Sequence, residues 1–444
     1  MESLLGNTED AMESQGVYTK QQRIATLAKL HPEVSFTSMA HYVDLEWLQE
    51  AYRRTRKDAA VGVDGVTAAE YEVGLDDRLK KLLEGFKSGT YKAPPVRRVY
   101  IPKDETGKEK RPIGIPTMED KVLQRAIVML LEPLYEVDFS NSSFGFRPGR
   151  SPHLALTALR TSIKHSTGKW VLELDIRKFF DTMKHEHLLQ QIKRRVCDGV
   201  VIRMIGKWLS AGVMEGGNVH FPDEGSPQGG VISPILSNIH LHEVLDAWFE
   251  KEIQPKLQGQ SGLIRFADDA VLTFENEHDA RRVHEVLPKR FAKYGLELHP
   301  EKTRLVYFGK PSSGGAEPQT FDFLGFTHYW CKSYKGYWAV FRKTMKKRLK
   351  RAIARMNKWN RENQHEPIEE QWKTIKAKMR GHYQYYGVTS NGRSLALFYM
   401  RVKEIWRKWL SRRSAGGVPM SWKEFERILR RFPLPVPKIC HSFA

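Results

Sequence analysis

The chain has few cysteines, no long apolar run and, in its last quarter, no aspartate at all. Its three cysteines, Cys197, Cys331 and Cys440, lie far apart and form no CxxC pair. This spacing argues against a zinc site or a disulfide framework and suits a reducing compartment. No apolar run approaches the roughly 20 residues that span a bilayer. The acidic opening residues, MESLLGNTEDAMESQ, lack the basic start and apolar centre of a signal peptide. We therefore expect a cytoplasmic protein.

The composition is that of an ordinary globular chain, with 41% hydrophobic and 28% charged residues. A chain of 444 residues is too long for one hydrophobic core, so roughly two to four domains are expected.

Positive charge is concentrated toward the C-terminal end. The whole chain carries a formal net charge of +20, and residues 331–444 alone hold 28 Lys and Arg against 7 Glu. The preceding 330 residues hold 44 basic and 45 acidic side chains and are nearly neutral. A solvated helix face would explain some of this charge, but a one-sided block repels itself unless a polyanion neutralises it. We therefore expect this part of the chain to bind nucleic acid, with an affinity that falls as salt rises.

The basic block has the periodicity of amphipathic helices. Apolar side chains recur at spacings of three and four in KTMKKRLKRAIARMNKWN (343–360), and RVKEIWRKWLSRRS (401–414) repeats the design. These stripes predict the core of a three-helix bundle with a basic face over roughly 340–412. The stripe residues are Met345, Leu349, Ile353, Met356 and Trp359 in the first segment, and Val402, Ile405, Trp406, Trp409 and Leu410 in the second.

Between the two stripes, RGHYQYYGV (380–388) adds three tyrosines, Tyr383, Tyr385 and Tyr386. With the interleaved lysines and arginines, these rings could stack on bases while the cations grip a backbone. Beyond the bundle, GGVPM (416–420) breaks the helical pattern, and RFPLPVPKICHSFA (431–444) predicts a proline-rich, non-helical end.

Two adjacent aspartates interrupt an apolar, β-prone run, LIRFADDAVLTF, at residues 263–274. Strand interiors disfavour aspartate, and two neighbouring carboxylates repel each other. The apolar residues on both sides predict a β-hairpin whose turn carries Asp268 and Asp269. Aspartate is common in turns, so this pair alone indicates little about function.

A third carboxylate closes another apolar strand. In WVLELDIRKFFDTM (170–183), Asp175 ends the strand and could meet the hairpin on a neighbouring strand. Three carboxylates together would require cations, and two Mg²⁺ ions, with Mn²⁺ as a substitute, suit such hard oxygen ligands and substrate phosphates. Such a site can activate an attacking 3′-hydroxyl and stabilise a leaving pyrophosphate oxygen. Asp181 is a rival ligand, but it falls where a helix is expected to have begun, so we predict Asp175.

These two segments resemble the metal-binding blocks of reverse transcriptases. RFADDAVLTF is similar to their [YF]xDD core, and ELDIRKFFD to the metal-binding strand that precedes it. Other segments resemble the remaining blocks of group II intron-encoded reverse transcriptases, in the right order from about Ala59 to Trp330: GVDGVT (62–67), residues 96–151, GSPQGGVISPILSNIHLHEVLD (225–246), GLELHPEKTRLVYF (295–308) and FDFLGFTHYW (321–330). The basic bundle is similar to the thumb of that family, also called maturase domain X, and residues 20–58 to its N-terminal extension.

The resemblance implies a metal site and a triphosphate clamp. Asp175, Asp268 and Asp269 would hold the two metal ions, with the carbonyl of Ile176 as a backbone ligand. Lys103 and Arg111 flank a glycine-containing hairpin, PKDETGKEKRP, and would clamp the incoming triphosphate, because a point charge and a forked guanidinium suit phosphates. The alternative for that hairpin is a charged, exposed turn.

The resemblance also implies contacts to the rest of the nucleotide. Phe180 would stack under the sugar and exclude a 2′-hydroxyl by its bulk; core packing is the alternative, which Phe179 could supply instead. Gln228, in the PQGG turn, would touch the nucleotide and position the template base, and Lys302 is a weaker candidate for the phosphates. His185 and His187 have no matching metal ligand elsewhere, so we expect surface or core roles for them.

The chain departs from the family pattern at two places. Phe266 stands where many relatives carry Tyr, which removes a hydroxyl but keeps the ring. Some group II intron proteins continue into a DNA-binding segment and a nuclease with cysteine pairs, whereas this sequence has no such cluster in its last 30 or so residues. We therefore expect the bacterial type that lacks an endonuclease and, if it is mobile, uses another primer such as a nascent strand.

The predicted fold is an α+β right-hand polymerase: fingers, a palm with an antiparallel sheet, and a helical thumb. The expected division is an N-terminal extension (1–58), fingers and palm (59–335), the thumb or domain X (336–412) and a short basic, proline-containing segment (413–444). The thumb and the extension would hold the template–primer duplex through its A-form shape and backbone.

The expected reaction is RNA-templated addition of dNMP to the 3′ end of a DNA or RNA primer. The resemblance further implies that the protein binds a structured group II intron RNA, assists its splicing and supports its mobility. Two alternatives remain: a free-standing reverse transcriptase used in DNA repair or defence, and a splicing cofactor without polymerase activity. The intact Asp175, Asp268 and Asp269 argue against the second. No membrane partner is expected.

Overall fold

The structure, a computed structural model, describes residues 6–102, 110–165, 169–221, 225, 229–312, 316–413 and 420–442. The chain forms two compact units, the first made mainly of residues 6–305 and the second mainly of residues 306–442. No described helix is long and apolar enough to cross a membrane.

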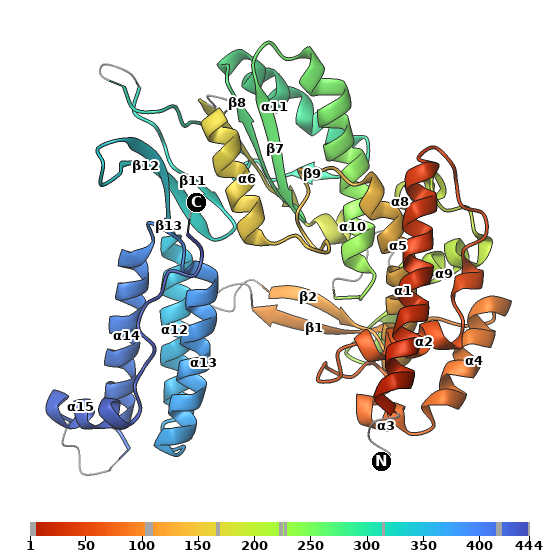
Figure 1. The fold of residues 1–444 in the computed structure, drawn as a ribbon, viewed down its shortest axis with the longest axis horizontal. Coiled ribbons are helices and arrows are strands. Elements are labelled where there is room, and N and C mark those ends of the chain that lie inside the picture. Colours follow the sequence, from red (N-terminus) through yellow and green to blue (C-terminus); the bar gives the residue numbers. More distant parts are fainter. Residues whose placement is uncertain are drawn as a thin grey trace. The chain divides into compact units, whose positions relative to one another are not determined.

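The first unit begins with helices packed on a buried helix, α5 (Met118–Asp138), which is apolar along most of its length. Helices α1 (Gly6–Leu30), α2 (Leu45–Arg54) and α3 (Ala68–Glu72) contact α5, and α4 (Leu75–Ser88) contacts α2 (Figure 1). Asp44 caps α2 by accepting a hydrogen bond from the Trp47 amide. Lys20 of α1 lies 2.6 Å from the Asp44 carboxylate, and the Trp47 indole donates to the Ala126 carbonyl of α5. One ion pair, one helix cap and one buried indole therefore fix the N-terminal helices.

Two sheets of the first unit carry the predicted site. One has the strand order β2-β1-β5-β6, and its strands are β1 (Val96–Pro102), β2 (Lys110–Ile115), β5 (Val213–Glu215) and β6 (Asn218–His220). The other has the order β10-β3-β8-β7, and its strands are β3 (Trp170–Leu174), β7 (Ser261–Phe266), β8 (Asp269–Phe274) and β10 (Arg304–Tyr307). Helix α6 (Pro152–His165) packs on β7 and β8, and α11 (Glu277–Ala292) packs on β8 (Figure 1).

Shorter elements connect these sheets. Strand β4 (Ile176–Arg177) pairs antiparallel with β9 (Glu297–Leu298). The helices are α7 (Phe179–Thr182), α8 (His185–Lys193), α9 (Gly199–Leu209) and α10 (Ser233–Leu241), and α10 continues into a π-helical turn, His242–Asp246. The carboxylate of Asp198 caps α9 and also accepts hydrogen bonds from the amides of Met39 and Ala40, at 2.6 and 2.8 Å. One carboxylate thus ties the N-terminal region to α9.

The second unit combines a small sheet with a helical bundle. Its strands are β11 (Phe321–Phe323), β12 (Phe326–Lys332) and β13 (Trp338–Thr344), and its helices are α12 (Lys346–Glu362), α13 (Ile368–Tyr386), α14 (Gly392–Leu410) and α15 (Trp422–Arg431). Met356, Val402 and Trp406 are buried in the bundle core, and Leu349, Ile353 and Trp359 pack against it. The predicted three-helix bundle is confirmed, but its first helix begins at Lys346, because Lys343 and Thr344 belong to β13 and Met345 precedes the helix. Leu349, Ile353 and Trp359 of the first stripe are only partly buried.

Helix α15 was missed by the sequence prediction, which treated residues 413–444 as a proline-containing segment. Ser421 and Glu424 form a capping box that starts this helix, and Phe425 is buried against the bundle. The last described residues are non-helical as predicted, and His441 forms a β-bridge with Val388. The α+β class with antiparallel pairing and a helical C-terminal region is confirmed, while the four-part domain division stays a prediction.

Candidate active site

The two adjacent aspartates lie at the turn of the β7–β8 hairpin. Phe266 at the end of β7 pairs with Asp269 at the start of β8, so Ala267 and Asp268 form the turn itself. Asp268 is half-buried and Asp269 is exposed. The backbone of Ala267 has φ of 56°, a left-handed conformation that residues with a Cβ rarely adopt. The predicted hairpin is confirmed, and its turn is held in an unusual conformation.

Asp175 lies close to this turn, although it is far from it in the sequence. It directly follows β3, and β3 is the hydrogen-bonded neighbour of β8 in the sheet. Burial raises the pKa of Asp268 above its ordinary value, the negative charge of Asp175 raises it further, and the positive charge of Arg111 opposes the rise. The structure therefore brings two of the three predicted metal ligands, and one predicted phosphate ligand, into electrostatic contact.

Two residues of the turn after β9 contact Asp175, one through its backbone carbonyl and one through its carboxylate. The amide of His299 donates to the backbone carbonyl of Asp175 at 2.8 Å. The ammonium group of Lys302 lies 3.3 Å from the Asp175 carboxylate. Lys302, which the sequence proposed as a phosphate contact, thus stands directly beside a predicted metal ligand.

The donor set fits an open divalent-metal site. Among the residues that the structure describes, no three Asp, Glu, His or Cys side chains gather into a complete metal-ligating group. Mg²⁺ in nucleotide-processing enzymes is usually held by one or two carboxylates, together with substrate phosphates and water. Asp175 and Asp268 form such a pair, and the pKa of Asp268 is raised chiefly by burial and also by the charge of Asp175, which the positive charges of Arg111 and Arg265 only partly offset. A cation at this position would offset that rise further.

Short helix α7 carries two consecutive phenylalanines that differ in burial. Phe179 is buried, whereas Phe180 is half-buried, and their ring centroids lie 5.1 Å apart in an edge-on arrangement. The core role is therefore taken by Phe179. Asp181, the rival ligand, lies within a helix as predicted and is exposed, and the Ile176 side chain is buried in β4.

Two glycines flank the predicted nucleotide contact Gln228. Gly229 has φ of +110°, and a Cβ on it would lie 2.8 Å from the Gly114 carbonyl oxygen of β2. Gly225 has φ of +94°, and a Cβ on it would lie 2.8 Å from the Phe180 carbonyl oxygen. Each contact requires glycine, so the segment is closely packed at both ends.

The contacts of Gly225 and Gly229 reach two elements that carry other predicted site residues, α7 and β2. Gly114 lies on the same strand as Arg111, so Gly229 meets β2, while Gly225 meets α7. Gln228 and Lys103 themselves lie outside the described residues. His185 contacts the Gly225 carbonyl and His187 packs edge-on against Tyr294, in line with the structural roles expected for them.

Sequence reasoning missed the residues that support the aspartate turn. Arg265 of β7 is completely buried and hydrogen-bonds Asp246, Asn238 and the Ala267 carbonyl. An arginine inside an apolar strand run was the available signal, because such a charge is buried only with a partner. Gly145 was also missed, and a Cβ on it would lie 2.2 Å from the Ala267 nitrogen.

Comparison with known proteins agrees with this geometry. Residues 101–328 match the family model described as reverse transcriptase (RNA-dependent DNA polymerase). The chain is 40% identical over 230 residues to protein YkfC of Escherichia coli strain K12, covering 50% of this chain and 60% of that protein. It is 34% identical over 284 residues to the group II intron-encoded protein LtrA of Lactococcus lactis subsp. cremoris, covering 61% of this chain and 46% of that protein.

A more distant similarity extends to plants. The chain is 30% identical over 206 residues to nuclear intron maturase 2, mitochondrial, of Arabidopsis thaliana, covering 35% of this chain and 28% of that protein. The chain spans about half the length of the curated relatives it matches. The family model covers half of the chain and includes the Asp175 strand and the aspartate hairpin. The chain therefore belongs to the reverse transcriptase (RNA-dependent DNA polymerase) family.

Proposed function

We propose that this protein is an RNA-directed DNA polymerase that adds dNMPs to a primer 3′ end. The observation that carries the proposal is the meeting of Asp175 and Asp268 at the ends of neighbouring strands, with Arg111 in electrostatic reach of Asp268. Membership of the reverse transcriptase family supports the same reaction. A carboxylate pair with an adjacent guanidinium suits metal ions that bridge to a triphosphate.

The charges at the site indicate how the residues would divide the work. Reverse transcriptase domains depend in general on divalent metal, and two ions would activate the primer 3′-hydroxyl and neutralise charge on the leaving pyrophosphate. Asp175, Asp268 and Asp269, with the Ile176 carbonyl, would hold these ions, for which we propose Mg²⁺ with Mn²⁺ as a substitute. Arg111, Lys302 and Lys103 would contact the triphosphate of the dNTP.

Selection of the nucleotide would depend on a neighbouring surface. The half-buried ring of Phe180 would lie under the sugar and collide with a 2′-hydroxyl. Gln228 would contact the nucleotide and its template base, and the nearby Gly225 and Gly229 pack against α7 and β2.

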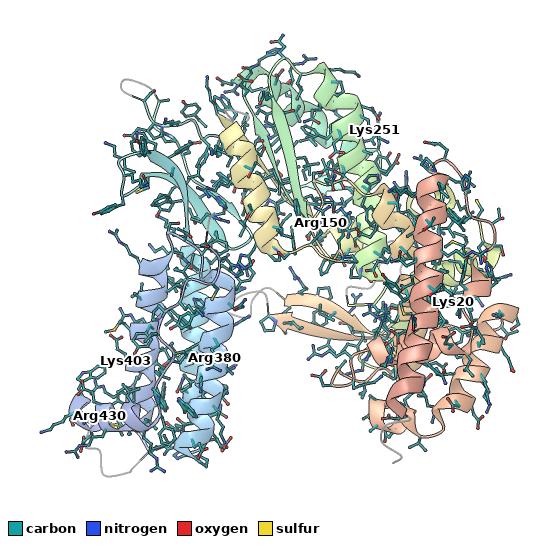
Figure 2. The ribbon with its side chains drawn as sticks, viewed as in Figure 1. Lys20, Arg150, Lys251, Arg380, Lys403 and Arg430 are labelled. Atoms are coloured by element: carbon teal, nitrogen blue, oxygen red, sulfur yellow. The ribbon has the colours of Figure 1, made fainter. Side chains whose placement is uncertain are left out.

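The second unit would hold the nucleic acid. A groove of about 460 Å³ between α12 and α14 is lined by Lys350, Arg401 and Lys408, with Glu404 as its one acidic side chain. Figure 2 shows Arg380 on α13, Lys403 on α14 and Arg430 on α15, so each of these helices carries basic side chains. Phosphates of an RNA template or of its duplex with the primer would bind such a surface through counterion release.

Primer extension on an RNA template tests the polymerase proposal. With dNTPs and Mg²⁺, the parent protein should extend a primer, and Asp268→Ala should not, while RNA binding is retained. Asp181→Ala is the matched control, because Asp181 is an exposed aspartate of the neighbouring helix and should leave extension intact. Absence of extension by the parent, with tight salt-sensitive RNA binding, would favour a splicing cofactor instead.

We further propose that the protein binds a group II intron RNA and promotes its splicing. The names of two relatives, a group II intron-encoded protein and an intron maturase, support this role. Splicing of the intron RNA at physiological Mg²⁺ should require the protein but tolerate Asp268→Ala. Unchanged splicing without the protein would leave a free-standing reverse transcriptase as the better interpretation.

A further inference from the structure

Arg265 directs nearly all of its donors to partners around the aspartate turn. Its Nε and Nη2 atoms donate to the two Asp246 carboxylate oxygens at 2.7 and 2.6 Å. Its Nη1 atom donates to the Asn238 side-chain oxygen and to the Ala267 carbonyl, both at 3.0 Å. Both charged side chains of this pair are completely buried. The guanidinium therefore links a rigid ion pair to the residue that immediately precedes Asp268.

The two partners of Arg265 come from one helical segment. Asn238 lies on α10 and Asp246 ends the π-helical turn that follows it. Eight residues of regular α-helix would place them about 80° apart around the axis, and the wider π turn reduces that offset. Both side chains can thus face the same arginine. π turns are often found at functional sites.

A second segment supports the turn from the other side. The Ser142 carbonyl accepts from the Arg265 amide, and the Phe144 amide donates to the Arg265 carbonyl, each at 2.8 Å. The next residue, Gly145, lies so close to the turn that an added Cβ would come 2.2 Å from the Ala267 nitrogen. The side-chain amide of Asn238 donates to the Gly145 carbonyl at 2.8 Å. Because the Asn238 side-chain oxygen also accepts from Arg265, one residue links the Gly145 segment to the buried ion pair.

We propose that Arg265, Asn238, Asp246 and Gly145 form a buried support that positions Asp268 for metal binding. The left-handed backbone of Ala267 is unfavourable for alanine and persists only where the surroundings enforce it. Here a hydrogen bond to its carbonyl and the close packing of Gly145 enforce it. These residues act through the turn and are positioning residues. This inference rests on the proposed polymerase function for its role in turnover, but not for its effect on metal affinity.

The test separates positioning from folding by replacing the buried ion pair as a unit. Arg265→Met alone would leave the Asp246 charge buried and unpaired and would unfold much of the protein. The double variant Arg265→Met/Asp246→Leu replaces both charges by apolar groups of similar size, a change that is often neutral for stability. It should fold, but it has lost the hydrogen bond to the Ala267 carbonyl.

A second pair of variants tests the packing contact. Gly145→Ala forces a Cβ against the Ala267 nitrogen, whereas Gly206→Ala in α9 places its Cβ in open space. Gly206→Ala is therefore the matched control for a glycine substitution that leaves the turn untouched.

Three readouts decide the outcome: thermal unfolding, Mn²⁺ affinity of the protein alone by electron paramagnetic resonance, and kcat with KM for primer extension. In the double variant and Gly145→Ala, we expect Mn²⁺ affinity to fall roughly 10- to 100-fold. We expect kcat to fall about 100-fold, with the KM for template–primer unchanged. Gly206→Ala should match the parent.

Folded variants with parental Mn²⁺ affinity and kcat would overturn the inference. If the parent extends no primer but the variants still lose Mn²⁺ affinity, the positioning role stands and the polymerase proposal falls. The two proposals can therefore fail separately.

Discussion

At the residue scale, buried aspartates of this chain differ in what neutralises them. Burial raises the pKa of Asp246, but the Arg265 guanidinium outweighs it and holds that pKa below the ordinary value. Burial also raises the pKa of Asp268, which stays raised because Asp175 adds negative charge and the nearby arginines compensate incompletely. Asp246 thus has a guanidinium bonded to it within the fold, whereas at Asp268 burial outweighs the positive charges of the nearby arginines.

Asp120 of α5 is a third case and predicts a pH dependence of stability. It is buried and accepts hydrogen bonds from the Tyr91 hydroxyl and the Trp208 indole, both at 2.9 Å. Burial raises its pKa to about 6, from an ordinary value near 3.8. The native state therefore binds this proton more tightly than the unfolded state, so protonation stabilises the fold. As pH falls from about 6 to about 4, protonation of Asp120 should raise the free energy of unfolding by roughly 2–3 kcal/mol. Above pH 6 this stabilising contribution should be absent.

Denaturant unfolding of the parent and of Asp120→Asn across pH 4–7 measures this contribution as the difference between their free energies of unfolding. Asn keeps an acceptor for Tyr91 and Trp208 but cannot titrate, so the parent should gain stability relative to it on acidification. Asp77→Asn on α4 is the control, because that carboxylate is largely exposed and should give a flat difference. A flat difference for Asp120→Asn as well would contradict the assignment.

At the element scale, a four-residue helix determines which of two adjacent rings can meet a nucleotide. Helix α7 follows Lys178, whose backbone is left-handed with φ of 48°. It places Phe179 in the core near His240 and leaves Phe180 half-buried. No local pattern distinguishes the two consecutive phenylalanines, and the family resemblance assigned the sugar contact to Phe180; in the structure the two rings differ in burial on α7.

Replacement of each ring should therefore have a different effect. Phe180→Val would remove bulk beneath the sugar and raise the kcat/KM for rNTPs relative to dNTPs. Phe179→Val should leave that ratio unchanged and lower the free energy of unfolding by about 1–3 kcal/mol, because it opens a cavity in the core. Steady-state incorporation of matched rNTP and dNTP measures the ratio. Unaltered sugar discrimination in an active Phe180→Val protein would refute the steric role.

The elements that were predicted share strong local patterns. Continuous apolar, β-prone runs indicated β3 and the β7–β8 hairpin, and spacings of three and four indicated α12 and α14. Helix α15 was missed because prolines and glycines on both sides of it drew the prediction toward an irregular end. Its Ser421–Glu424 capping box was the local signal that should have been used.

At the scale of the whole molecule, charge is divided unequally along the chain. Residues 331–444 carry 28 basic and 7 acidic side chains, while the first 330 residues are almost balanced. The basic groove between α12 and α14 concentrates part of that charge in one place. Phosphate binding there would make RNA affinity strongly dependent on salt.

Removing three groove cations should weaken RNA binding and its salt dependence together. For Lys350→Gln/Arg401→Gln/Lys408→Gln, the slope of log affinity against log salt should fall by about 2 units, because each phosphate contact contributes roughly 0.7–0.9. Titration of a fluorescent RNA duplex at several salt concentrations gives the slope.

The matched control removes three exposed lysines of α4 in the first unit, Lys80, Lys81 and Lys87. It changes the net charge by the same amount and should alter the slope by much less. Equal effects of the two triple variants would show that net charge, and not the groove, governs RNA binding.

Local periodicity and ordered motifs in the sequence were enough to predict β3, the β7–β8 hairpin, the bundle helices α12 and α14 and the family, but not helix α15. The sequence also pointed to Asp175 and Asp268 as partners, although 93 positions separate them, because each lies at the end of an apolar strand run and because both segments resemble metal-binding blocks of reverse transcriptases. Tertiary structure alone decided that their strands are neighbours, that Lys302 contacts Asp175, and that Arg265 and Gly145 support the turn. Those contacts join residues far apart in the sequence, and no local pattern encodes the burial and close packing that give them their effect.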